Sequence, residues 1–296
     1  MNIPENSLIV SLPAWFEQTL KASYTKVEAR ALARIVMEEV SEREMTNILA
    51  DPGAKWSPDQ LDEVDRIFTA LLASEPIQYI LGFADFMDLR FRVIPGVLIP
   101  RGETEELLNW IIEDLKKMGV GNGDGLRILD IGCGSGIIGI ILAREFPGAS
   151  VTCTDLFPIP LEITKENAIR NTVDIGVEQM DALNPSAEWL NKSYDVIVSN
   201  PPYVTEKQKA AMSPNVLDNE PGDALFVQDD NPLVFYRQIS KYASKVLKSD
   251  GCLYFEINED LGNETKSLAN SYFKFVELKK DIHGKERMIK AYDGSQ

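Results

Sequence analysis

Over residues 126–292 the chain alternates between short apolar runs and longer segments whose apolar residues recur with helical spacing. Apolar runs of roughly four to eight residues are typical of buried strands, and the helical spacing between them indicates covering helices. One helix is expected to start near residue 137 and another to span about 232–246. The expected strands are residues 127–131, 151–154, 177–180, 195–199, 252–257, 273–280 and 286–292. This pattern predicts an α/β domain built on a largely parallel sheet.

The first 75 residues differ, because helical spacing is the only regular pattern in them. Thr25 and Glu28 form a capping-box signature, and Ser57-Pro58 marks a second helix start. Pro76 is expected to end that second helix. The apolar positions expected on the inner faces of the two helices are Val27, Ala31, Ile35 and Val36, then Leu61, Val64, Phe68 and Leu71. This segment predicts a small helical bundle that serves packing or partner binding.

A change of pattern separates these two parts of the chain. Residues 82–86 and 89–93 alternate like the arms of a β-hairpin. We therefore predict a helical domain at 1–75, a hairpin linker at 76–97 and an α/β domain at 98–296. Just after the hairpin, Arg101, Glu103 and Thr104 lead into a helix and are candidates for a pocket. Helix capping and pairing with the helix dipole would explain the same residues equally well.

Candidate binding residues stand at the ends of the first three strands of the α/β part. Asp130 precedes Gly132-Cys133-Gly134-Ser135-Gly136, a glycine-rich turn that lets a ligand approach the backbone at a helix N-terminus. Asp155 ends the second strand, where a carboxylate can accept both hydroxyls of a ribose. Asp181 and Ala182 end the third strand, where an adenine would lie. The turn is one residue tighter than the dinucleotide fingerprint, which weakens the case for NAD.

The fourth strand ends at Asn200-Pro201-Pro202-Tyr203. Two consecutive prolines lack the N–H groups that a central strand needs, so the chain must leave the sheet at Asn200. The Asn side chain offers an acceptor oxygen and two N–H donors, and the Pro201 carbonyl can accept from a substrate N–H. The Tyr203 ring can stack on a planar group. This set suits a planar amide or exocyclic amine, whereas a tight turn is the purely structural alternative.

Composition narrows the possible partners. The 296 residues include 30 basic and 46 acidic side chains, a formal charge of −16, which disfavours binding to nucleic acid. No apolar run approaches the length of a membrane span, and the N-terminal residues do not resemble a secretory signal. Cys133, Cys153 and Cys252 stand apart and His283 is the only histidine, so we expect reduced core cysteines and no metal site. A cytoplasmic location is expected.

Taken in order, the strand-end residues resemble the motifs of class I S-adenosylmethionine-dependent methyltransferases, with Asp130–Gly136 as the first motif. Further segments make the chain similar to the PrmC/HemK family over nearly its whole length. These segments are residues 75–82, Ile99-Pro100-Arg101 with Glu103-Thr104-Glu105, Asn200–Tyr203, and Asn219-Glu220-Pro221 followed by Ala224-Leu225. Two positions depart from the family pattern: Gly102 replaces a usual proline, and Ala182 stands where some members have an aromatic residue.

The resemblance implies a Rossmann-like methyltransferase sheet with a small helical N-terminal domain that recognises the substrate. It implies methyl transfer from S-adenosyl-L-methionine to the side-chain N5 of the glutamine in the Gly-Gly-Gln motif of peptide-chain release factors. It also implies catalytic roles for Asn200, Pro201 and Tyr203, with Pro202 joining them around the substrate. Cofactor contacts are then expected from Asp130, Gly132, Cys133, Gly134, Ser135, Gly136, Asp155, Asp181, Ala182 and Asn200.

Two other functions remain open from the residues. An N6-adenine DNA or RNA methyltransferase uses a similar Asn-Pro-Pro-Tyr loop on a flipped base, although the charge of −16 opposes it. A non-catalytic S-adenosylmethionine-binding scaffold would need the cofactor loop but not Asn200.

Overall fold

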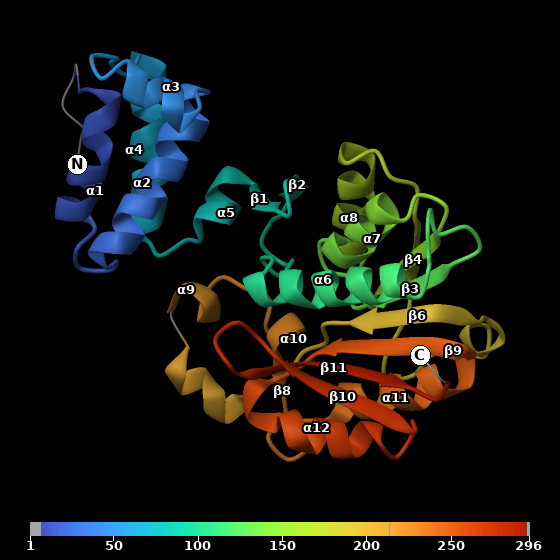
Figure 1. Cartoon of the computed structure of the whole chain (residues 1–296). Helices are drawn as coiled ribbons and strands as arrows, with labels where there is room; N and C mark the ends of the chain where they lie inside the picture. Colours follow the sequence, from blue (N-terminus) through green and yellow to red (C-terminus); the bar gives the residue numbers. More distant parts are fainter. Residues whose placement is uncertain (1–6, 213, 295–296) are drawn as a thin grey trace. The chain divides into compact units, whose positions relative to one another are not determined.

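The computed structural model describes residues 7–212 and 214–294. The chain divides into two compact units, and Figure 1 colours it from the N-terminus to the C-terminus. The smaller unit consists of Met1–Leu81 with Pro214–Asn219, and the larger one of Gly82–Ser213 with Glu220–Gln296. None of the helices in the described part of the chain combines the length and apolarity needed to cross a bilayer.

The smaller unit is helical, as the periodicity predicts. Its α-helices are α1 (Leu12–Thr19), α2 (Lys26–Ser41), α3 (Met45–Ala50), α4 (Pro58–Leu72), α5 (Ile77–Leu81) and α9 (Pro214–Leu217), with a 3₁₀ turn at Ile9–Ser11. Both expected capping boxes are present, at Thr25 for α2 and at Ser57 for α4. Helix α4 also buries most of its expected face, because Val64, Phe68 and Leu71 are within the core and Leu61 is partly buried against it.

The expected inner face of α2 is wrong except at Val36, which is buried. Val27 is 78% exposed and Ile35 is also exposed, whereas Ala29 and Ala33 are buried. Both sets of positions recur with helical spacing, so periodicity alone does not choose between them. Ala29 and Ala33 belong to the core cluster of this unit, and the larger Val27 is left outside it.

Two further features of this unit differ from a simple bundle. Helix α4 ends at Leu72, and Pro76 precedes α5 instead of ending α4, because Ser74 already turns the chain with a φ of 64°. The segment Pro214–Asn219 comes from much later in the sequence. Asn219 Nδ2 donates to the Ser74 carbonyl at 3.1 Å and Asn215 Nδ2 to the Tyr24 hydroxyl at 3.4 Å.

The larger unit confirms the α/β prediction. Its main sheet has seven strands in the order β10-β11-β9-β6-β3-β4-β5, and five of them, β9 to β5 in that order, run parallel. Strands β10 and β11 pair antiparallel with each other, and β11 pairs antiparallel with β9. The strands of the sheet are β3 (Arg127–Ile131), β4 (Ser150–Asp155), β5 (Gly176–Gln179), β6 (Tyr194–Ser199), β9 (Leu247–Glu256), β10 (Phe275–Lys280) and β11 (Glu286–Tyr292).

Helices cover both faces of this sheet. The α-helices of the larger unit are α6 (Gly102–Lys117), α7 (Ile137–Glu145), α8 (Pro158–Arg170), α10 (Gly222–Leu225), α11 (Val234–Val246) and α12 (Gly262–Ala269). Short 3₁₀ turns lie at Trp189–Asn191, Glu206–Ala211 and Glu259–Leu261. The hairpin strands β1 (Phe83–Phe86) and β2 (Leu89–Arg92) pair as expected, and β7 (Val204–Thr205) pairs with β8 (Phe226–Val227).

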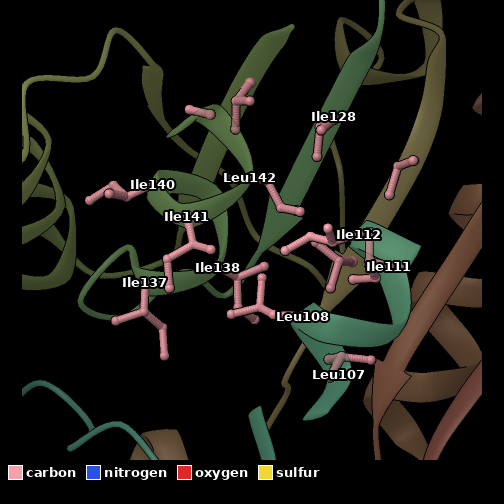
Figure 2. Packing of buried hydrophobic residues seen from close by; sticks show 14 of the residues in the cluster. Leu107, Leu108, Ile111, Ile112, Ile128, Ile137, Ile138, Ile140, Ile141 and Leu142 are labelled. Carbon is pink, nitrogen blue, oxygen red and sulfur yellow. The ribbon is translucent and has the colours of Figure 1, made fainter. Parts of the chain in front are cut away.

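Alternation along each strand sorts the core into two layers. Val196 and Val198 of β6 join the cluster with α6 and α7, whereas Ile197 between them joins the cluster with α11 and α12. Figure 2 shows the first layer, in which Leu108 of α6 and Ile138 of α7 meet in a cluster that includes Ile128 of β3. This period-two rule decides which side chains at the strand ends point toward the start of α6.

Candidate active site

A cavity of about 570 Å³ lies at the carboxyl ends of the parallel strands, entirely within the larger unit. Residues 132–135, 155–160, 180–183 and 199–202 line it, and they follow β3, β4, β5 and β6. The chain moves to one side of β3 for β4 and β5 and returns to the other side for β6, so this edge is a topological switch point. Such crevices are where open α/β sheets bind ligands. The segment before α6 and residues of α7, α10 and α11 also line it.

The glycine-rich turn gives the cavity its backbone floor. Gly132, Gly134 and Gly136 have φ values of 76°, 56° and 82°, in the left-handed region that favours glycine. A Cβ at Gly132 or Gly134 would meet no atom within 4 Å, so open space faces these two residues. A Cβ at Gly136 would lie 2.8 Å from Thr164 Cγ2 of α8, so that glycine is needed for packing. The turn therefore leaves room for a ligand against the backbone.

Asp130 lies beneath this turn and is fully buried. Its Oδ2 accepts from the Gly139 N–H at 3.1 Å, while its Oδ1 has no hydrogen-bond partner among the described residues. Burial, with a smaller contribution from the charge of Asp155, raises the pKa of the Asp130 carboxyl to about 7. A buried acceptor without a partner marks a position where a bound polar group would be stabilised.

Asp155 ends β4 and lines the cavity. Its Oδ2 accepts from the Gly134 N–H and its Oδ1 from the Phe157 N–H, each at 3.1 Å. Burial raises the pKa of Asp155, and these backbone hydrogen bonds oppose the rise. The carboxylate is thus held by backbone donors from two successive strand-end loops, with lone pairs left for a diol.

The end of β5 forms another wall of the cavity. Asp181 and Ala182 both line it, and Asp181 Oδ1 accepts from the Leu183 N–H at 2.8 Å, which closes a tight turn. Ala182 also packs against the layer formed with α11 and α12. The expected adenine contact at these residues stays a prediction.

The alternation of side chains along β6 determines which way the Asn200 side chain points. It follows Val196 and Val198 at a spacing of two residues, so its side chain points to the face that α6 covers. There its Nδ2 donates to Thr104 Oγ1 at 3.4 Å. Asn200, Pro201 and Pro202 line the cavity beside the glycine-rich turn.

Tyr203 is anchored away from the cavity lining. Its ring packs against the layer formed with α11 and α12, and its hydroxyl donates to Glu256 Oε1 at 3.1 Å. Asn258 Nδ2 donates to the Tyr203 carbonyl at 2.8 Å, and the Tyr203 N–H donates to the Leu225 carbonyl at 3.2 Å. These contacts fix the end of the loop, while stacking of the ring on a substrate stays a prediction.

Not all of the candidate pocket residues at the start of α6 line the cavity. Thr104 is buried and lines the cavity together with Arg101, whereas Glu103 does not line it. The Arg101 guanidinium forms an ion pair with Glu220, whose side chain is 1% exposed, and the Ile99 N–H donates to the same carboxylate at 3.4 Å. This pair ties the segment before α6 to the loop before α10, so two family-like motifs meet at one side of the cavity.

Sequence reasoning missed two residues of this site. Gly139 of α7 donates its N–H to Asp130, and a Cβ there would lie only 2.1 Å from Cys153 Sγ. Glu256 at the end of β9 is 1% exposed and joins Thr104 to Tyr203. An acid that ends a buried strand is the signal that singled out Asp155, and the same signal applied to β9 would have found Glu256.

Comparison with known proteins identifies relatives of the whole chain. Residues 12–82 match the PrmC N-terminal domain and residues 109–221 the methyltransferase small domain. The chain is 42% identical to the release factor glutamine methyltransferase of Flavobacterium psychrophilum, over 96% of this chain and 98% of that protein. It is 38% identical to that of Bacteroides thetaiotaomicron, over 95% and 98% of the two chains. The chain belongs to the release factor glutamine methyltransferase family.

A solved structure supports the fold of this family member. The T. thermophilus 16S rRNA N2 G1207 methyltransferase, a complex with AdoMet and guanosine, superimposes with a TM-score of 0.52 at 20% identity. The match covers 71% of this chain and 49% of that one. At this identity the likeness concerns the methyltransferase fold alone.

The family's cofactor, S-adenosyl-L-methionine, fits the residues that line the cavity. Gly132 and Gly134 leave space against the backbone, Asp155 offers acceptors for a ribose diol, and Asp130 Oδ1 offers a buried acceptor. Residues 180–183 and 156–159 supply mostly apolar walls beside them, as a flat base requires. Across residues 7–212 and 214–294, no three His, Cys, Asp or Glu side chains are grouped to hold a metal ion.

Proposed function

We propose that this protein transfers the methyl group of S-adenosyl-L-methionine to the side-chain N5 of the glutamine in the Gly-Gly-Gln motif of peptide-chain release factors. The observation that carries the proposal is the hydrogen bond from Asn200 Nδ2 to Thr104 Oγ1, next to the glycine-rich turn. This bond leaves the acceptor oxygen of Asn200 for a substrate N–H. The chain is 42% identical to a release factor glutamine methyltransferase, which supports a glutamine side chain as the substrate.

The chemistry requires orientation more than acid or base catalysis. A carboxamide nitrogen is a poor nucleophile because its lone pair is delocalised into the carbonyl group. When bound, the cofactor supplies a methyl group on a sulfonium sulfur, which is already strongly electrophilic. Asn200 Oδ1 and the Pro201 carbonyl accept the two amide hydrogens and turn the nitrogen's face toward the glycine-rich turn. These two oxygens also stabilise positive charge that develops on the nitrogen.

No strong general base is required, because the amide proton leaves after positive charge has developed on the nitrogen. The loop of Asn200, Pro201 and Pro202 has a restricted backbone, because both prolines have fixed φ angles. Its far end is held at Tyr203 by Asn258 and Glu256. The chain's contribution is therefore a rigid acceptor pair at a fixed place in the cavity.

An N6-adenine methyltransferase is the second candidate, because Asn200-Pro201-Pro202-Tyr203 would suit an exocyclic amine as well as an amide. The formal charge of −16 opposes binding to a phosphate backbone. A scaffold that binds the cofactor without catalysis is the third candidate.

One labelling experiment separates these functions. The purified chain is incubated with methyl-labelled S-adenosylmethionine and either release factor or DNA, and each product is analysed by mass spectrometry. We expect label on the release factor only, lost when the Gly-Gly-Gln glutamine is replaced by alanine. Label on DNA would support the adenine enzyme, and cofactor binding without any transfer would support the scaffold.

We also propose that the helical unit recognises the release factor. It holds none of the cavity residues, and it exposes large apolar side chains, including Val27 at 78% and Leu49 at 63%. Replacing both by serine should raise KM for intact release factor while the affinity for the cofactor stays unchanged. Equal KM values for wild type and the double variant would contradict this role.

The expected location in the cytoplasm belongs to the same proposal. Cys133, Cys153 and Cys252 are buried and form no disulfide within the described residues, which suits a reducing compartment. A release factor substrate would be met there.

A further inference from the structure

Glu256 is a buried ionisable group next to the Asn200 loop. Glu256 is 1% exposed, does not line the cavity, and is the last residue of β9. A buried carboxylate is costly unless its oxygens are paired. Its Oε2 accepts from Thr104 Oγ1 at 2.6 Å, and its Oε1 accepts from the Tyr203 hydroxyl at 3.1 Å.

Strand register explains why Glu256 stands beside the methyl-acceptor loop. Ser199 of β6 pairs with Phe255 of β9, so the residues that follow them, Asn200 and Glu256, are neighbours. Tyr254 of β9 belongs to the layer covered by α6, and Glu256 follows it by two residues on the same face. Thr104 on the first turn of α6 reaches both side chains from above that face.

The donors and acceptors in this chain of contacts can be ordered in only one way when Glu256 is ionised. A carboxylate carries no hydrogen, so the Thr104 hydroxyl must donate to it. The Thr104 oxygen can then only accept a hydrogen from Asn200, which must present its Nδ2. The opposite flip would set the Asn200 oxygen against the Thr104 oxygen with no hydrogen between them. Asn200 Oδ1 is thereby left as the group that faces a substrate amide.

We propose that Glu256 is a positioning residue for methyl transfer, which fixes the amide orientation of Asn200 through Thr104 and holds the end of the substrate loop through Tyr203. The inference rests on the proposed function, because it takes Asn200 as the acceptor of a substrate N–H. Glu256 touches neither the cavity nor the reacting atoms, so it acts only through these two neighbours.

Protonation of Glu256 breaks this ordering. A protonated carboxyl can itself donate to Thr104, whose hydroxyl hydrogen is then released toward Asn200, and both amide flips become compatible with the contacts. Burial raises the pKa of Glu256, Glu103 of α6 raises it further, and the hydrogen bonds from Thr104 and Tyr203 together with the charge of Arg287 from β11 lower it. Transfer should therefore slow as the pH falls through this raised pKa.

Other groups near Glu256 do not supply the same pH effect. Tyr236 of α11 donates to the Glu256 backbone carbonyl at 3.4 Å, and burial raises its pKa well above the ordinary value for tyrosine. Tyr203 likewise has a raised pKa. Both phenols stay neutral below about pH 10, so an acid limb of the rate points to a carboxyl group.

Four variants test the inference: Glu256→Gln, Thr104→Val, Thr104→Ser and the double variant Glu256→Gln/Thr104→Val. The rate of single-turnover methyl transfer to release factor is measured at saturating cofactor and at several pH values. Both Glu256→Gln and Thr104→Val should be at least ~10-fold slower than wild type, because each removes one step of the same ordering. Thr104→Ser keeps the hydroxyl and should recover most of the loss seen with valine.

Two readouts distinguish positioning from a general loss of structure. The double variant should be no slower than the slower single variant, since both act on one path. The acid limb of Glu256→Gln should be weaker than that of the wild type. Cofactor affinity by calorimetry should change less than twofold in all four. Fully additive losses, an unchanged acid limb in Glu256→Gln, or wild-type rates in both single variants would overturn the inference.

The same data separate this inference from the proposed function. A wild-type chain that binds cofactor but does not methylate release factor overturns the proposed function, and the inference falls with it. A wild-type chain that methylates release factor while the variants match its rate overturns the inference alone. If Glu256→Gln does not fold, the difference in transfer rate between Thr104→Val and Thr104→Ser tests the inference.

Discussion

In the half of the cavity that includes Asp130 and Asp155, each acidic side chain is bonded to a backbone N–H no more than 21 positions away. In the half around Asn200 the bonds join side chains that lie 53 to 152 positions apart. A backbone donor stays in place when its own side chain is changed. A network of side chains loses its order when any one member is removed. The hydrogen bonds of the first half should therefore be kept when neighbouring residues are substituted, whereas those of the second half should be lost more easily.

The largest effect should follow from Asn200→Ala, which removes the end of the side-chain network that faces the cavity. We expect a loss in kcat on the order of 10²-fold or more, comparable to the removal of one oxyanion-hole donor. Asn200→Asp should be similarly slow, because it keeps the shape but loses the N–H₂ that Thr104 accepts. Cofactor titration in the same variants should show a smaller change than kcat. Near-normal transfer by Asn200→Ala would leave the loop as a structural turn.

The next effect concerns Asp130 and depends on pH. Its folded-state pKa of about 7 lies above the value of an unfolded aspartate, so its contribution to stability is full below about pH 4 and is lost as pH rises through about 7. An asparagine side chain does not ionise, so Asp130→Asn should be more stable than wild type at about pH 8, by roughly 2–4 kcal/mol at most. Below about pH 4 the difference should be small. Thermal unfolding of the ligand-free protein at both pH values measures it, and an equal difference at the two would show that ionisation plays no part.

Asp155→Ala should affect the cofactor half alone. It removes both acceptors at the end of β4 and leaves the N–H groups of Gly134 and Phe157 unpaired. We expect cofactor affinity to fall by roughly 1–3 kcal/mol, while single-turnover transfer at saturating cofactor falls less. Asp174→Ala is the matched control, because Asp174 is exposed and does not line the cavity. Calorimetry that gives equal affinities for the two variants would remove Asp155 from the cofactor site.

The smallest effect should be a gain in stability from Gly102→Pro at the first position of α6. Arg101 before it is extended, with φ −108° and ψ 149°, which a following proline favours. Proline suits the first helical position because no intrahelical bond uses its N–H, and it restricts the unfolded chain. The free energy of unfolding should rise by ~0.4–1 kcal/mol, with kcat little changed. Gly102→Ala is the control, and a destabilised proline variant would mean that the turn at Arg101 needs glycine.

Much of the fold followed from local patterns. The strands, the hairpin, both capping boxes and the helix at 102–117 depend on side chains and turns that are close in sequence, so periodicity finds them. The buried face of α2 shows what periodicity does not determine. Val27 and Ala29 both belong to helical repeats, and only packing within the helical unit decides that Ala29 is the inner one.

The candidate site also has one part that local sequence determines and one part that it does not. The sequence itself determined that Asp130, Asp155 and Asn200 stand at strand ends, because each ends a strand-like run and a glycine-rich turn or two prolines follow the first and the last of them. Only the tertiary structure decided that Glu256, Thr104 and Asn200 meet, since that depends on the pairing of β6 with β9 and on α6 covering one face of both. Strand order and helix placement are set by burial of the whole core, and no local stretch of the chain contains that information.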